Sequence, residues 1–258
     1  MKIEELKANV QKIIDKHVVD KRHNEPQERS SFRASGITDC PRALIFNMMN
    51  LPEDKYPRAK TDSAKGYKLM DHGSAIHTLI QNYFIEIGIL DPNDLERKKS
   101  LWDPETLFSG HCDGIITLEG ERILLEIKTI NDRGFESISQ PKEAHFYQGQ
   151  AYVHFLNKLY GEKLDKILFL YVNRNSDDLA MKEFWIKADT NISGIIVNKL
   201  KILKQFLDKK EIYPIPEGFT PDKKTFNPCC WCPFKTEQLC LSKRTKMSDY
   251  PETNIVTR

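Results

Sequence analysis

The chain has 258 residues, and 40% of them are hydrophobic before its 12 glycines are counted. This length allows one large domain or two small ones, and this composition is that of an ordinary soluble globular protein. The net charge of +2 argues against a surface coated with basic residues, although a local positive field is still possible. No apolar run approaches the ~20 residues that a membrane helix needs, and the charged start has no signal-peptide core, so we expect a cytoplasmic protein without membrane contact.

Three helices separated by loops are predicted in the N-terminal part, where apolar residues recur every three or four positions. The helices are expected over about residues 3–18, 41–52 and 69–87, with loops over 21–34 and 53–65. Pro41 is a favoured first helical residue, which leaves Cys40 at the cap. Gly73 and His77 fall on the apolar face of the third helix.

The remainder of the chain alternates between strand-like and helix-like segments. Strands are expected over about 112–118, 123–129, 166–173 and 181–187, and helices over about 143–160 and 191–208. A loop-like, cysteine-rich tail follows. This order indicates an α/β or α+β fold with a mixed central sheet flanked by helices. We expect an N-terminal helical region (1–65), a core (66–210) and a cysteine-rich segment (211–258).

A set of acidic and basic residues stands out in the predicted hairpin. Glu126 and Lys128 are two residues apart, so they share a face of their strand. If the turn is centred between Glu119 and Gly120, Asp113 lies directly opposite Glu126, with Cβ atoms ~5 Å apart. A three-residue turn would shift this register by one. Two facing carboxylates can share a divalent metal; a solvated salt network of Asp, Glu and Lys explains the same residues without one.

A resemblance becomes specific when four motifs are taken together. Gly110-x-x-Asp113 followed by Glu126-x-Lys128-Thr129 resembles the core of the PD-(D/E)XK nuclease superfamily, a restriction-endonuclease-like fold. Gly73-x-x-x-His77 upstream and Gln148-x-x-x-Tyr152 downstream are similar to the motifs of RecB-like nucleases, including the CRISPR-associated RecB-like exonucleases. The match covers roughly residues 35–240.

The resemblance implies a role for each motif residue. The implied ligands of Mg²⁺ or Mn²⁺ are His77, Asp113, Glu126 and the carbonyl of Ile127. Lys128 would position or help deprotonate the attacking water and stabilise the developing phosphorane charge. Asp113, Glu126 and Lys128 would form the catalytic set. Gln148 and Tyr152, one helical turn apart, would contact DNA. Taken alone, a histidine such as His77 on an apolar helix face is more often a core residue, and a tyrosine such as Tyr152 is more often simply packed.

The tail carries a second constellation, because four of the six cysteines fall between Cys229 and Cys240. Cys229 and Cys232 form a CxxC pair, Cys240 supplies a third thiol, and spacing alone favours zinc. The setting of Cys40 resembles the lone early cysteine of iron–sulfur RecB-like nucleases, which implies a [4Fe–4S] cluster on these four cysteines and a cysteine-stapled helical and loop subdomain. Cys230 is a possible substitute ligand. Cys112 is expected to be a buried core thiol.

Together these features predict a metal-dependent DNA exonuclease with a structural [4Fe–4S] cluster, acting in recombination, repair or CRISPR-type adaptation. Its substrate would be DNA with a free end. The chain contains no P-loop motif, so a helicase, recombinase or integrase could be a partner. Two alternatives are a catalytically idle nuclease fold that serves as a DNA-binding or assembly module, and a zinc-stapled endonuclease.

Overall fold

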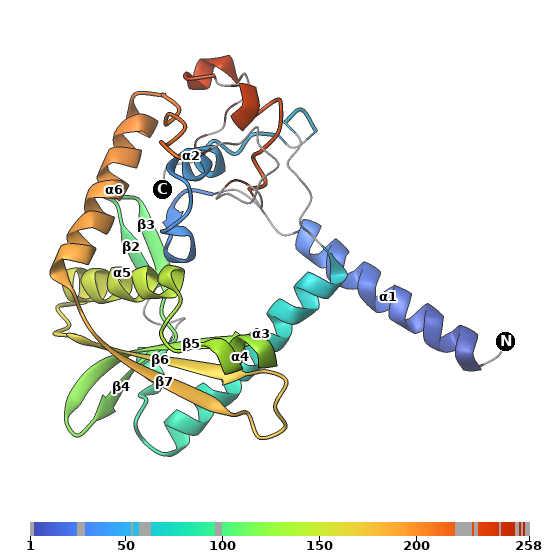
Figure 1. The fold of residues 1–258 in the computed structure, drawn as a ribbon, viewed down its shortest axis with the longest axis vertical. Coiled ribbons are helices and arrows are strands. Elements are labelled where there is room, and N and C mark those ends of the chain that lie inside the picture. The colour runs from blue at the N-terminus through green and yellow to red at the C-terminus, as the bar shows by residue number, and fades with distance from the viewer. Residues whose placement is uncertain are drawn as a thin grey trace.

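The computed structural model describes residues 3–24, 29–52, 54–56, 63–95, 100–219, 229, 232–242, 244–250, 253 and 255 (Figure 1). The helices are α1 (Ile3–Asn24), α2 (Pro41–Met48), α3 (Ala64–Glu86), α4 (Asp132–Ser137), α5 (Glu143–Tyr160) and α6 (Thr190–Asp208). The strands are β1 (Phe32–Arg33), β2 (Ser100–Asp103), β3 (Phe108–His111), β4 (Gly114–Leu118), β5 (Glu121–Ile130), β6 (Lys166–Asn173) and β7 (Met181–Lys187). Short 3-10 helices cover Ala34–Gly36, Pro92–Asp94, Cys240–Ser242 and Met247–Asp249.

The strands form two mixed sheets. The larger has the order β4-β5-β6-β7, with β5 and β6 parallel and the two outer pairs antiparallel. The smaller has the order β1-β3-β2, with β1 parallel and β2 antiparallel to β3. The expected mixed α/β architecture is therefore confirmed.

Helices cover both faces of the larger sheet, and this explains its apolar central strands. On one face, α5 packs against Leu124, Ile167 and Phe169, and on the other, α3 packs against Leu125 and Ile127. Figure 1 shows α5 lying along one side of the sheet while α3 crosses the other. Strands buried on both faces read as continuous apolar runs rather than alternating ones, as β6 does.

The regular elements after residue 112 match their predicted bounds closely, whereas several short elements were not predicted. The helix α5 and the strands β6 and β7 have the expected limits. The predicted loop over residues 21–34 is wrong at both ends, because α1 continues to Asn24 and β1 occupies Phe32–Arg33. The smaller sheet and α4 were missed, because segments of two to six residues show no measurable period.

The segment around α2 joins distant parts of the chain. The guanidinium of Arg42, which is only 2% exposed, donates hydrogen bonds to the carbonyls of Tyr213 and Arg244. The ring of Phe46 packs against Phe234 and Tyr250. The tail after α6 is thereby fixed against the start of the chain, as the neighbouring blue and red segments in Figure 1 show.

The N-terminal helix α1 is less embedded. It projects away from the other elements in Figure 1 and is linked to α3 by ion pairs of Arg22 with Asp71 and of Lys68 with Asp15. Among the residues that the structure describes, no helix is long and apolar enough to cross a membrane.

The turn between β4 and β5 sets the register on which the predicted site depends. Leu118 pairs with Glu121 and Gly114 with Leu125, so the turn consists of Glu119 and Gly120 alone. Both turn residues have positive φ, 50° and 82°, as a type I′ hairpin turn requires. The predicted two-residue turn is confirmed.

Gly120 tests how much the fold depends on this turn. We expect Gly120→Ala to lower the free energy of unfolding by about 1 kcal/mol, because a side chain is disfavoured at positive φ although the space around it is open. Gly194→Ala is the matched control: Gly194 also has open space, but it lies within α6, so alanine should raise the free energy of unfolding by about 1 kcal/mol. Urea unfolding followed by circular dichroism measures both, and effects of the same sign would contradict this view of the turn.

Candidate active site

Asp113 is held from three directions at the open end of the hairpin. It stands one residue before β4, whose last pair is Gly114 with Leu125. Continuing this register by one residue brings Asp113 opposite Glu126. Its Oδ2 accepts the backbone N–H of Ile127 at 2.6 Å, and its Oδ1 lies 3.1 Å from Nδ1 of His77. Gln81 donates to the Asp113 carbonyl at 2.7 Å. The carboxylate therefore has a fixed orientation, set by β5 and α3.

Gln81 was not predicted from the sequence, although a signal was present. It lies four residues after His77, so both side chains project from one side of α3 toward the same aspartate. Gly73, one turn before His77, explains the first motif. A Cβ at Gly73 would lie 3.1 Å from Oγ1 of Thr129, so glycine permits the close approach of α3 to β5 that brings His77 to Asp113.

Glu126 is the most deeply buried acidic residue of the site, with 1% of its surface exposed. Its Oε2 lies 2.7 Å from Nζ of Lys128, on the same face of β5. Its Oε1 is buried and accepts no hydrogen bond from any residue that the structure describes. A buried carboxylate oxygen without a donor costs free energy, so this atom has room for one more donor or a cation.

The site shifts the pKa of Asp113 downward and the pKa values of Glu126 and Lys128 upward. Burial and the nearby Asp113 raise the pKa of Glu126 to about 7, against the opposing effect of Lys128. Burial also acts on Asp113, but the hydrogen bond with His77 and the charge of Lys128 bring its pKa below the usual value. The pKa of Lys128 is raised, because the two carboxylates outweigh its burial. Near neutral pH, Asp113 is ionised and Lys128 is protonated, while Glu126 titrates.

The helix α5 contributes the predicted pair Gln148 and Tyr152. Gln148 donates a hydrogen bond to the hydroxyl of Tyr152 at 3.2 Å. Tyr152 is only 3% exposed, and burial together with the charge of Glu126 raises its pKa well above normal. A Cβ at Gly110 would lie 2.5 Å from the Tyr152 ring, so the glycine of the second motif makes room for this tyrosine. Tyr152 thus closes the wall of the site, and Gln148 is the more accessible of the two.

His145 and Tyr171 also adjoin the site and were not predicted. Tyr171 pairs with Lys128 across β5 and β6, and its hydroxyl lies 2.6 Å from Nδ1 of His145. Burial and the charge of Lys128 lower the pKa of His145 to about 4. A neutral imidazole therefore stands near Lys128 at neutral pH.

The four cysteines singled out in the sequence line one small cavity. Its volume is about 20 Å³, and its cysteines are Cys40, Cys229, Cys232 and Cys240. Burial and the three neighbouring thiols raise the pKa of Cys232 to about 11. Cys112 is fully buried elsewhere, as expected, whereas Cys230 lies outside the described residues.

Neither the carboxylate site nor the cysteine cavity has its side chains already arranged around a metal position, within the described residues. Within the described part of the chain, no three His, Cys, Asp or Glu side chains are arranged as a metal-binding group. The residues nevertheless fit a cation at both places. Within the described residues, Oε1 of Glu126 receives no hydrogen bond although the carboxylate lies near Asp113. The thiols around Cys232 ionise readily only if a cation offsets their mutual repulsion.

Comparisons with known proteins give distant structural similarity only. No family model matches the chain, and no curated protein matches it. Among solved structures, SSO0001 is 16% identical, with a TM-score of 0.47 over 77% of this chain and 87% of that one. LHK-Exo, an alkaline exonuclease from Laribacter hongkongensis that was also solved in complex with dAMP, is 19% identical, with a TM-score of 0.45 over 70% and 89%. Scores at this level do not establish a shared fold, so the function must follow from the residues of the site.

The titration of Glu126 predicts how stability depends on pH without metal. Because its pKa rises to about 7 in the folded state, the native protein holds its proton more tightly than the unfolded chain, and stability falls as pH rises from about 4.5 through 7. We expect Glu126→Gln to be more stable than the wild type at pH 8 by on the order of 1 kcal/mol, with a smaller difference at pH 5.

Urea unfolding in EDTA at both pH values measures this difference. Glu217→Gln, at an exposed position, is the control and should show no such pH-dependent gain. If Glu126→Gln is equally destabilising at pH 5 and pH 8, the raised pKa is wrong.

Proposed function

We propose that this protein is a divalent-metal-dependent nuclease that hydrolyses phosphodiester bonds in DNA and acts as an exonuclease from a free end. The observation that carries the proposal is the placement of two buried carboxylates opposite each other and beside a lysine. One of their oxygens has no hydrogen-bond donor among the residues that the structure describes. A structural salt network accounts for the pair of Lys128 and Glu126, but it supplies no donor for the second oxygen of Glu126 among the described residues. Buried side-chain oxygens of this kind are suited to a hard cation such as Mg²⁺ or Mn²⁺.

The residues that would hold the metal are Asp113, Glu126 and His77, together with the carbonyl of Ile127. When bound, the metal would supply Lewis-acid stabilisation of the phosphoryl oxygens and lower the pKa of a water molecule. The backbone bond to Ile127 holds Asp113 in place, and His77 restrains its second oxygen. Lys128, which stays protonated, places a positive charge where charge develops on the phosphate.

The remaining residues of the site define its walls. Gln148, the more accessible member of the α5 pair, is suited to a hydrogen bond with the strand backbone. Specificity for strand and end, rather than for base sequence, suits a site whose polar groups are carboxylates, a lysine and amides. A catalytically idle module for DNA binding is the alternative, and it predicts that the carboxylates are dispensable.

We also propose that Cys40, Cys229, Cys232 and Cys240 bind a structural [4Fe–4S] cluster. Their common cavity supports a four-thiolate site, and its walls of Phe46, Phe234 and Ala43 would shield the cluster from water. Zinc is the alternative for the same four ligands. Either would fasten the segment before α2 to the tail.

The nuclease proposal predicts that Asp113→Ala reduces cleavage of end-labelled linear DNA in Mn²⁺ or Mg²⁺ by at least about a hundredfold. Asp208→Ala is the control, because this exposed carboxylate at the end of α6 pairs only with Lys204 among the residues described. Circular DNA should resist the wild type. Equal cleavage by the wild type and Asp113→Ala would sink the assignment.

The cluster proposal predicts a brown protein with a visible charge-transfer band, bound iron and acid-labile sulfide. Cys40→Ala should lose the band and the iron, whereas Cys112→Ala, at a thiol outside the cavity, should keep both. A colourless protein with one zinc per chain would replace the cluster with the zinc alternative.

A further inference from the structure

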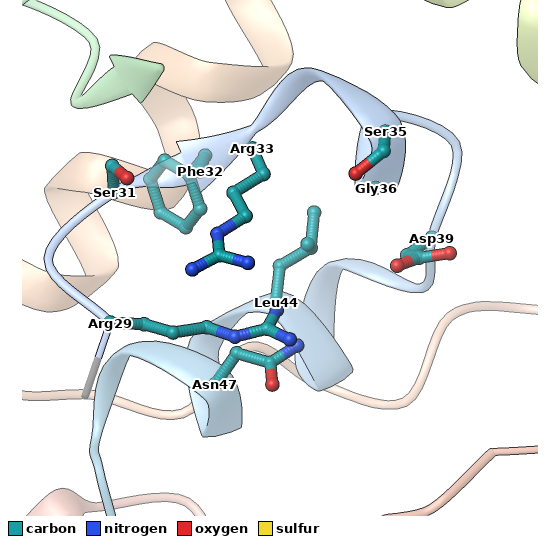
Figure 2. Close-up of a pocket in the computed structure, with 9 residues that line it drawn as sticks. All are labelled: Arg29, Ser31, Phe32, Arg33, Ser35, Gly36, Asp39, Leu44 and Asn47. Atoms are coloured by element: carbon teal, nitrogen blue, oxygen red, sulfur yellow. The ribbon is translucent and has the colours of Figure 1, made fainter. Parts of the chain in front are cut away.

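A cavity of about 150 Å³ lies between β1, the following 3-10 helix and α2, and its lining includes none of the active-site residues or cysteines described above. Figure 2 shows the side chains that line it. Its polar groups come from Arg29, Ser31, Arg33, Ser35, Asp39 and Asn47. The cavity is thus rich in hydrogen-bond donors, and none of these residues belongs to the motifs that define the candidate active site.

Arg29 and Arg33 determine the charge of the cavity. In Figure 2 their guanidinium groups reach into the cavity from neighbouring parts of the segment. The side-chain amide of Asn47 lies beside the guanidinium group of Arg29. The Arg33 side chain is exposed and forms no hydrogen bond or ion pair with any residue that the structure describes. The lining contains two guanidinium groups and one carboxylate, that of Asp39, so it carries a net positive charge. Guanidinium forks match the oxygens of a phosphate group.

The cavity adjoins the candidate active site through the smaller sheet. In the pairing of β1 with β3, Arg33 lies opposite Ser109, and Oγ of Ser31 is 2.7 Å from Oγ of Ser109. The next residue of β3 is Gly110, whose missing Cβ makes room for the Tyr152 ring and for Ala34. The segment that carries Arg33 therefore packs directly against the wall of the carboxylate site.

From this placement we propose that the cavity binds a phosphate group of the nucleic-acid strand that enters the carboxylate site. The proposal rests on the proposed nuclease function for the identity of the strand, but its chemistry is independent of catalysis. The phosphate could be a terminal monoester or an internal diester, since both present the oxygens that two guanidinium groups recognise. Held there, the strand would be positioned relative to Asp113 and Glu126 without any contact to a base.

Binding measured without cleavage tests the proposal. Fluorescence anisotropy in EDTA would compare short labelled DNA strands that carry a 5′-phosphate, a 3′-phosphate or no terminal phosphate. We expect Arg33→Ala to weaken binding about tenfold and to lower the salt dependence, as the loss of one phosphate contact does. Arg33→Lys should recover part of the affinity, and Asp39→Asn, which removes the opposing charge, should tighten binding.

Lys163→Ala is the charge-matched control, because Lys163 is exposed in the loop after α5 and should leave binding unchanged. An Arg33 effect confined to a phosphorylated end identifies a terminal monoester, and an equal effect on all strands identifies a backbone diester. Wild-type affinity in Arg33→Ala, or an equal loss in Lys163→Ala, would overturn the proposal. A protein that cleaves nothing but still binds through Arg33 would defeat the nuclease function and leave the phosphate site standing.

Discussion

The structure depends on one constraint, the burial of Asp113 and Glu126 opposite each other at the open end of a two-residue hairpin. The ladder from Leu118 and Glu121 back to Gly114 and Leu125 leaves no freedom in this register. Two buried carboxylates repel each other, and Lys128, His77 and the N–H of Ile127 offset part of that repulsion. The raised pKa of Glu126 is one consequence, and a bound cation would lower it.

Glycines allow the helices to reach this pair. Gly73 lets α3 approach Thr129, which brings His77 within 3.1 Å of Asp113. Gly110 leaves the space that the Tyr152 ring occupies, so α5 can close the site from the other face. The spacing of these two motifs therefore has a packing cause. In each, a glycine allows a close contact, and the functional residue follows it, His77 one helical turn after Gly73 and Asp113 three residues after Gly110.

The sequence predicted those parts of the fold in which apolar residues recur at helical spacing over many residues or form a continuous apolar run. Residues 143–160 and 166–173 are such segments, and their limits were accurate. The hairpin register followed from one turn, because Glu119-Gly120 suits positive φ at both positions. The smaller sheet was not predictable in this way, since β1 has two residues and its partners are distant in the chain. The arginine cavity was missed for the same reason, because Arg29 and Arg33 fall in a segment that appeared to be a loop.

The segment from Arg29 to Asn47 links the proposed sites. Its first part supplies the arginines of the phosphate cavity, and its second part supplies Cys40 to the cysteine cavity. Buried Arg42 ties the same segment to the tail through two carbonyls, and Ala34 packs near Tyr152 in the wall of the carboxylate site. A group bound by the four cysteines would therefore restrain both ends of the chain at once. Because the arginines lie on the same segment as Cys40, a cluster bound there would also hold the arginine cavity in place relative to the carboxylates. A structural cluster would then influence how the substrate is positioned.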